Sequence, residues 1–189
     1  MATDFITPSP QQLKALTHPA RLRMLGMLRV DGPATATSLA RALGLNTGAT
    51  SYHLRQLATY GFIEEDTERG NGRDRWWRAT SSSTRTANPA PDDVEANDTT
   101  DAYLQAVATI YAEQLQRSVE ELPLLPRPWR EAITYSDWHL RVSPAGAARL
   151  LERLQEVVES ATQEEGDDVV TYVVNLFGFA RPGQLGGDR

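Results

Sequence analysis

Small hydroxyl side chains, a tyrosine and one arginine recur at close spacing between residues 47 and 55. On a helical period, Thr47, Thr50, Ser51, Tyr52 and Arg55 fall on an outer face. Hydroxyl groups bond phosphate oxygens or base edges, and a guanidinium reaches either a guanine or a phosphate. Both destinations of the arginine stay open. The set predicts contact with double-stranded DNA.

A second basic group brackets a glycine-rich turn that contains Gly70 and Gly72. Its members are Arg69, Arg73 and Arg75. A flexible, basic hairpin tip suits the narrow and negative minor groove of DNA. The alternative is that Glu68 and Asp74 pair with these arginines, and that the turn is polar only for solubility. We favour DNA contact, because the neighbouring helix needs a clamp on the DNA backbone.

Both groups need elements that position them, and residues 35–60 have the pattern of a helix-turn-helix. A first helix, about Thr35 to Leu43, is closed by Gly44. Asn46 or Thr47 caps the second helix. The seam between the two helices is made by apolar residues at three- and four-residue spacing: Leu39, Ala40, Leu43, Leu54, Leu57 and Ala58.

The flanking residues extend this pattern to a domain over residues 11–80. A short helix begins at Gln11, and Pro19 starts a second helix that is apolar on more than one side and therefore central. Strand-like residues on either side of the Gly/Asn turn predict a β-hairpin. Because this hairpin directly follows the second helix of the helix-turn-helix in the sequence, we interpret it as a wing. Trp76 and Trp77 face opposite ways on a strand, so we expect one in the core and the other exposed or at an interface.

Charge and composition divide the chain. Residues 1–80 hold 10 Lys and Arg against 7 Asp and Glu, a net +3, and the remainder holds 9 against 18, a net −9. The first part can approach a polyanion and the second is repelled by it. Residues 1–10 and 183–189 are expected to be flexible, and residues 81–98 hold little to bury and are predicted as a linker.

Residues 99–182 are predicted as a helix-strand-helix-strand module. The helices are about Thr100 to Leu122 and Ser143 to Thr162, and the strands about residues 132–142 and 168–179. The whole chain is thus mainly α with a small β part, an α+β protein. We expect the module to serve dimerisation, and a small organic effector between its sheet and helices is a hypothesis from the layout alone. The residues predicted for a dimer interface are Leu13, Leu16, Tyr103, Leu104, Val107, Ile110 and Tyr111.

Three stretches resemble the bacterial ArsR-type winged-helix transcriptional regulators. They are LKALTHPARLRML (13–25), SLARALGLNTGATSYHLRQLATYGFIEE (38–65) and RDRWWRAT (73–80). The resemblance implies a homodimer, with the second helix of the helix-turn-helix in the major groove and the wing along the adjacent backbone or minor groove. The second half of the chain resembles only the extensions of some longer members, and no activity follows from it.

The sequence predicts no metal, cofactor or catalytic site. Many ArsR-type proteins sense metals through clusters of cysteine or histidine, but this chain has no cysteine, and His18, His53 and His139 lie in three different elements. A mixed histidine and carboxylate site between subunits is the less favoured alternative. The sequence has no phosphate loop and no nucleophile elbow, and we expect no enzyme. It has no run long enough to span a membrane and no signal-peptide pattern, which fits the cytoplasm.

These observations predict a cytoplasmic, homodimeric regulator, most simply a repressor, that binds an inverted repeat and is not a cysteine-based metal sensor. The alternative is a protein-interaction module, in which the winged helix is a scaffold and the acidic second half binds a partner protein. Binding that depends on salt and on Arg55 separates the two hypotheses.

Overall fold

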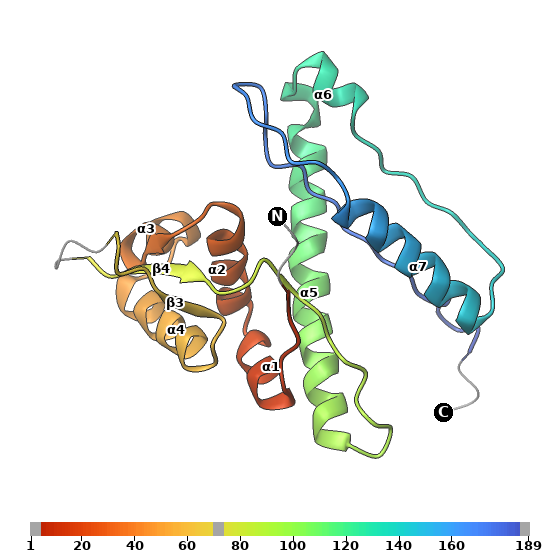
Figure 1. Cartoon of the computed structure of the whole chain (residues 1–189), viewed down its shortest axis with the longest axis horizontal. Helices are drawn as coiled ribbons and strands as arrows, with labels where there is room; N and C mark the ends of the chain where they lie inside the picture. The colour runs from red at the N-terminus through yellow and green to blue at the C-terminus, as the bar shows by residue number, and fades with distance from the viewer. Residues whose placement is uncertain (1–4, 70–73, 186–189) are drawn as a thin grey trace. The chain divides into compact units, whose positions relative to one another are not determined.

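The computed structural model describes residues 5–69 and 74–185. The predicted class is confirmed, because the structure is an α+β mixture with a helix-turn-helix near the N-terminus (Figure 1). Packing divides the chain into two units, residues 3–122 and 123–189. The elements in order are β1 (Phe5–Ile6), α1 (Pro10–Leu16), α2 (Pro19–Val30), β2 (Ala34–Thr35), α3 (Ala36–Leu43), α4 (Thr47–Thr59), β3 (Ile63–Glu65), β4 (Trp76–Ala79), β5 (Ser83–Thr84), α5 (Val94–Glu121), a 3-10 turn (Leu122–Leu124), α6 (Arg127–Glu131) and α7 (Pro144–Glu159).

The helix-turn-helix is α3 and α4, and its ends follow from local chemistry. The Thr35 side chain accepts a hydrogen bond from Ser38 N, which starts α3. Gly44 ends α3 with φ of 64°, a left-handed conformation that suits glycine. Asn46 Oδ1 accepts from Ala49 N at 2.8 Å and caps α4. The predicted glycine stop is confirmed, and of the two predicted caps the structure uses the asparagine.

One hydrophobic core holds the first unit together, with α2 at its centre. Met24 and Leu25 of α2 are fully buried. They belong to one apolar cluster with α1, α3, α4 and the hairpin, whose buried members include Leu16, Leu39, Leu54, Leu57, Phe62 and Ile63. Burying side chains of this size stabilises a fold by about 1.5–3 kcal/mol each. The predicted central role of the proline-started helix is confirmed.

The wing is a hairpin of β3 and β4 with a third, short strand on its other side. The order is β2-β4-β3, both pairs are antiparallel, and Glu65 lies opposite Trp77. Trp77 is buried at 7% exposure and Trp76 is half-buried, which agrees with one tryptophan in the core. The predicted glycine-rich turn falls mainly on residues 70–73, outside the described residues. Strand β2 was not predicted.

Residues 81–98 are more ordered than the predicted linker. Ser83–Thr84 form β5, which pairs in parallel with β1, and α5 begins at Val94. The cause is Arg29 of α2, which donates hydrogen bonds to Ser81 O, Ser81 Oγ and Thr84 Oγ1 at 2.9–3.2 Å. Helix α5 packs on α1 and α2, with Ala96, Tyr103 and Ala106 buried. The two compact units therefore divide after residue 122 and not at the predicted linker.

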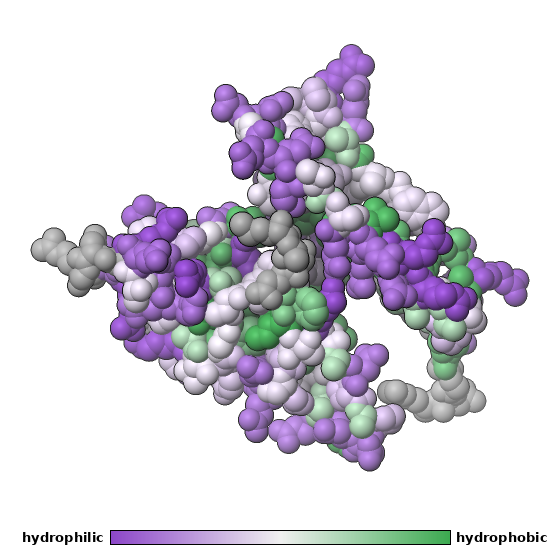
Figure 2. Space-filling model, viewed as in Figure 1, coloured by the Kyte–Doolittle hydropathy of each residue, from purple (hydrophilic) through white to green (hydrophobic). Residues whose placement is uncertain are grey.

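The second unit contains the predicted helix but not the predicted strands. Helix α7 begins where predicted, with Ser143 Oγ accepting from Gly146 N at 3.1 Å. Residues 132–142 and 168–179 are assigned to no strand, because alternating apolar residues alone do not supply a ladder partner. None of residues 123–185 is buried, and hydrophobic surface of this unit reaches solvent in Figure 2. Among the described residues, no helix combines the length and apolar character needed to cross a bilayer.

Candidate nucleic-acid interface

Helix α4 presents most, but not all, of the side chains predicted to contact DNA. Thr47, Tyr52 and Arg55 are exposed, and Ser51 is half-buried. Thr50 is a correction: its side chain has 0% exposure and its hydroxyl donates to Asn46 O at 3.0 Å. It lies on the same helix face as the buried leucines of α4 and has no surface to offer a ligand.

A hollow of about 300 Å³ joins α4 to the wing. Three elements line it: the start of α3, the exposed face of α4 and strand β4 with the residues before it. The lining residues are Thr35, Ala36, Thr37, Thr47, Ser51, Arg55, Asp74, Arg75 and Trp77. The structure thus brings Arg55 and Arg75, predicted from separate elements, to one concave surface. The contribution of α3 was missed, although its Thr-rich start was visible in the sequence.

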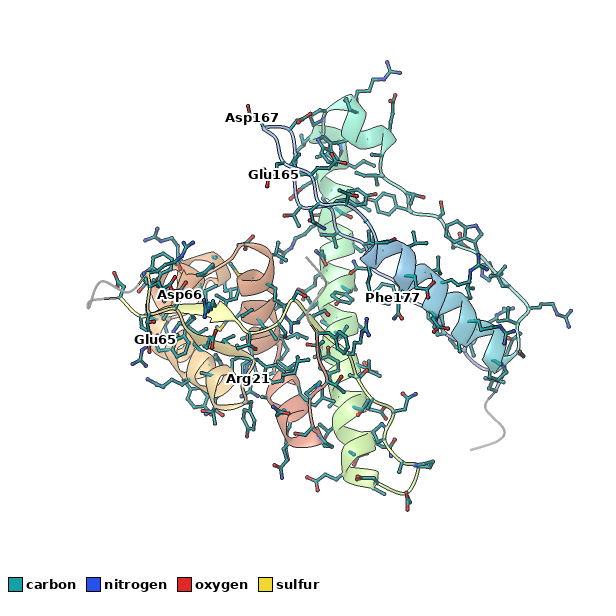
Figure 3. All side chains as sticks on the ribbon, viewed as in Figure 1. Arg21, Glu65, Asp66, Glu165, Asp167 and Phe177 are labelled. Carbon is teal, nitrogen blue, oxygen red and sulfur yellow. The ribbon has the colours of Figure 1, made fainter. Side chains whose placement is uncertain are left out.

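The described arginines of the wing are held by acidic neighbours. Arg75 Nε lies 3.0 Å from Glu65 Oε2, and its guanidinium carbon lies 5.6 Å from the centroid of the Trp77 ring. Arg69 Nε lies 3.5 Å from Asp66 Oδ2. Both carboxylates sit on the hairpin (Figure 3). Arg73 lies outside the described residues.

The alternative prediction for the wing, ion pairing of its arginines with acidic neighbours, applies to the arginines that the structure describes. The structure pairs Arg69 and Arg75 with Asp66 and Glu65, and it also pairs Arg78 with Glu64 at 2.8 Å. The Arg75 and Arg78 pairs are exposed on both sides and contribute about 0–1 kcal/mol each, so a phosphate can replace Glu65 or Glu64 at low cost, whereas Asp66, the partner of Arg69, is buried. In the described part of the chain no carboxylate pairs with Arg55, so its exposed guanidinium is available to a new partner.

Comparison with known proteins shows that the helix-turn-helix part of the chain is similar to that of known regulators. A family model described as a helix-turn-helix domain matches residues 16–66. The HTH-type transcriptional regulator YgaV of Escherichia coli (strain K12) is 42% identical over 52 residues, which are 28% of this chain and 52% of that protein. The HTH-type transcriptional regulator NmtR of Mycobacterium tuberculosis is 43% identical over 54 residues, 29% of this chain and 44% of that protein.

Residues 16–66 form an ArsR-type helix-turn-helix domain. The chain spans only about half the length of the relatives it matches. An apo structure of a Lactococcus lactis ZitR mutant matches 75% of this chain and 83% of its own, at 15% identity and a TM-score of 0.35, which is too low to support an argument. The match therefore concerns the ArsR-type domain and not the second unit.

Two histidines that are distant in sequence meet beside the ArsR-type domain's recognition helix. The rings of His18, before α2, and His53, on α4, have centroids 4.5 Å apart. His18 Nδ1 accepts from Ala20 N at 3.2 Å. Burial first, and then the charge of Arg21, lower the pKa of His18; burial, His18 and Arg21 lower the pKa of His53. Sequence spacing gave no signal for this contact.

This histidine pair does not resemble a metal centre. Arg21 beside it disfavours a cation, and one imidazole nitrogen is already used to cap α2. Across the residues that the structure describes, no three His, Cys, Asp or Glu side chains are grouped so that they could hold a metal ion. The geometry of this pair favours neutral imidazoles packed between α2 and α4.

The residues predicted for a dimer interface fall into two groups. Leu13, Leu16 and Tyr103 are buried at 8% exposure or less inside the first unit, and Val107 packs partly against the same core. These four side chains support the chain's own fold and have little surface for a second copy. The exposed or half-exposed members are Leu104, Ile110 and Tyr111 of α5, and of these Tyr111 also lies close enough to Arg29 of α2 to affect its pKa.

Proposed function

We propose that this chain is a sequence-specific, double-stranded-DNA-binding transcriptional regulator, and that it represses as a homodimer on an inverted-repeat operator. The observation that supports the proposal best is the hollow that unites Arg55 and Ser51 of α4 with Arg75 of the wing. The ArsR-type domain and the names of its relatives, which are transcriptional regulators, agree with this role.

In the proposed complex α4 enters the major groove. Arg55 is the residue for a guanine edge or a phosphate, and Thr47, Ser51 and Tyr52 add shorter contacts to phosphates and bases. Thr37, exposed near the start of α3, borders the same hollow and adds a hydroxyl that the sequence did not indicate.

The wing clamps the neighbouring backbone or minor groove in this proposal. Arg75 and Arg69 exchange Glu65 and Asp66 for phosphate oxygens, and Arg73 is proposed to act with them. For Arg75 the exchange costs little, because the side chains of Arg75 and Glu65 keep 58% and 44% of their surface. For Arg69 it would cost more, because its partner Asp66 is buried.

We propose that two copies place their recognition helices about 34–36 Å apart, one turn of DNA. The exposed apolar face of α5 is the proposed seam, since Leu104, Leu115 and Val119 keep about half of their surface at helical spacing. A small organic effector in the second unit, a cytoplasmic location and control independent of cysteine complete the proposal. No enzymatic activity is proposed.

A second candidate is a protein-interaction module whose second half binds a partner protein. The observation that favours it is the exposure of large hydrophobic residues in residues 123–185, where Trp138 and Phe179 keep 76% and 79% of their surface. In that case the ArsR-type domain would be a scaffold, and binding to DNA would not depend on Arg55.

An electrophoretic mobility shift with the DNA upstream of the chain's own gene separates the two candidates. We expect binding that weakens steeply between about 50 and 200 mM salt, and a roughly 10- to 100-fold loss of affinity in Arg55→Ala. Arg117→Ala, an exposed arginine of α5, is the matched control and should bind as the parent does. Binding that ignores both salt and Arg55→Ala would refute regulation through this surface.

A further inference from the structure

The run Val169–Ala180 has a composition that conflicts with its exposure. It is rich in β-branched and aromatic residues and has no charged side chain. A near-continuous apolar run of this kind is typical of a strand covered on both faces. In the structure every large apolar side chain of the run keeps 40% or more of its surface: Val169, Val170, Tyr172, Val173, Val174, Leu176, Phe177 and Phe179.

Contacts within its own unit fix this run, among them contacts of Tyr172 and Gly178. The Tyr172 hydroxyl donates to Ala132 O at 2.8 Å, and its ring stacks against Trp129 with centroids 6.5 Å apart. At Gly178 a Cβ atom would come within 2.8 Å of Leu151 Cδ2, so the backbone lies directly on α7. The run is therefore positioned by its own chain, yet those contacts cover little of it.

The accessible surface shows how much is left uncovered. The chain exposes 14346 Å². A compact monomer of 20.9 kDa exposes about 9,000 Å², and two separate compact units of the same combined mass expose about 11,000 Å². The surplus over two compact units is therefore roughly 3,500 Å². A standard interface covers about 800 Å² on each partner, and permanent homodimers cover more. The surplus of the whole chain is several times what a standard interface covers on one partner, so it leaves room for an interface with a second copy.

The charges at the two ends of the run indicate how a second copy would lie. Asp167 and Asp168 precede it, and Arg181 follows it. All three are exposed. In a parallel pairing the aspartates would face aspartates, whereas an antiparallel pairing centred on Val174 sets Asp167 opposite Arg181 of the second copy. Opposite charges stabilise a pair of strands when they face each other, and like charges destabilise it.

We propose that a second copy of this chain covers the run Val169–Ala180 by antiparallel strand pairing of the run with itself, with Val174 on the two-fold axis. Identical segments related by a two-fold axis perpendicular to the sheet are antiparallel, and the arrangement closes at two copies. Main-chain hydrogen bonds between the two copies of the run supply affinity, and the apolar side chains that face each other across the two-fold axis supply specificity. This inference rests on the proposed homodimer and names a second place where its copies meet.

Sedimentation of the full chain over a range of concentrations tests the pairing. Val174→Lys sets two lysines against each other on the axis, so the dissociation constant of the dimer should rise at least tenfold. Val30→Lys is the matched control, because Val30 of α2 has 56% exposure and Val174 has 54%. We expect the control to associate as the parent does. Equal association by the parent and both variants would overturn the pairing.

A charge exchange tests the orientation of the two copies. Asp167→Arg should weaken the dimer, because it places arginine opposite Arg181, and the double variant Asp167→Arg/Arg181→Asp should restore it. Failure of the double variant to recover association would overturn the antiparallel arrangement. Circular dichroism of each variant shows whether its helices remain folded.

Hydrogen exchange of the unchanged chain provides a test without substitutions. Amides of residues 170–179 should exchange more slowly at concentrations where the chain is a dimer than where it is a monomer. Fast exchange in the dimer would overturn the pairing. Leu115→Lys, on the proposed α5 seam, separates the two proposals: if it alone abolishes the dimer and Val174→Lys has no effect, the pairing fails while the homodimer stands. A chain that is monomeric at all concentrations and still binds its DNA would refute both seams.

Discussion

The two units of this chain use similar apolar residues in opposite ways. In the first unit Leu16, Met24, Leu25 and Phe62 have no exposed surface. In the second unit no residue between 123 and 185 is buried, although the unit holds tryptophans, tyrosines and phenylalanines. An apolar pattern therefore predicts which side chains favour burial, but it does not predict whether residues of the same chain bury them. The first unit buries a core within its own chain, whereas the second leaves its large apolar side chains exposed.

The largest expected effect compares one phenylalanine from each unit. Phe62→Ala should lower the free energy of unfolding by about 3–5 kcal/mol, because it removes a fully buried ring and leaves a cavity. Phe179→Ala, at 79% exposure, should change it by less than about 0.5 kcal/mol in dilute solution. Urea unfolding followed by circular dichroism measures both. Similar losses in the two variants would contradict the contrast between the units.

A smaller effect is expected from the buried arginine that fixes β5. Arg29→Ala should cost about 1–3 kcal/mol, because the Ser81 and Thr84 oxygens lose their donor in a half-buried site. Burial lowers the pKa of Arg29, which agrees with a guanidinium removed from water. Hydrogen exchange should show faster exchange at Arg85 N, which donates to Ile6 O. Unchanged exchange there would mean that β1 and β5 hold without Arg29.

The histidine pair predicts a pH dependence confined to the first unit. Burial lowers the pKa of both His18 and His53 in the folded chain, so below pH 6.5 the unfolded chain binds more protons than the folded chain. Stability should thus be full above pH 6.5 and fall as the pH falls through the lowered values. The melting temperature of His18→Gln/His53→Gln should depend less on pH than that of the parent. His139 is exposed in the second unit, so His139→Gln should keep the parent's pH dependence. A parent melting temperature that is flat from pH 7.5 to 5 would refute this.

The smallest expected effect concerns the ion pair that links α2 to α5. Arg23 Nη2 donates to both carboxylate oxygens of Glu113, at 2.8 and 2.6 Å, but about a third or more of each side chain is exposed. The variants Arg23→Gln and Glu113→Gln, combined in a double-mutant cycle, should give a coupling of about 1 kcal/mol or less that weakens with salt. A coupling of several kcal/mol would show that this ion pair holds α5 on α2 more firmly than exposed pairs usually do.

The local features of the ArsR-type domain could be predicted because their causes are local. Gly44 ends a helix through its own backbone freedom, and Pro19 starts one through its fixed φ. Thr50 was assigned wrongly because its hydroxyl was given more weight than its spacing: it precedes Leu54 and Leu57 by four and seven residues, which places it on the buried face.

The long-range features had no local cause and were missed. Arg29 and Ser81 are 52 residues apart, and His18 and His53 are 35 positions apart, so only the folded chain brings either pair together. The strands predicted at 132–142 and 168–179 failed for a related reason. A strand is defined by its neighbour, and the pattern of one segment does not say which chain the neighbour belongs to. The DNA contacts and the dimer interface stay predictions.

The ion pairs of the wing bear on how such a protein would search a chromosome. Glu64, Glu65 and Asp66 already neutralise Arg78, Arg75 and Arg69, so the hairpin offers arbitrary DNA less charge than its arginines suggest. Binding to unrelated sequence should therefore be brief, with frequent return to solution and little sliding. Long residence would begin only where Arg55 meets its matching base and the wing exchanges carboxylates for phosphates. The hairpin's acidic residues would in this way improve discrimination without touching a base.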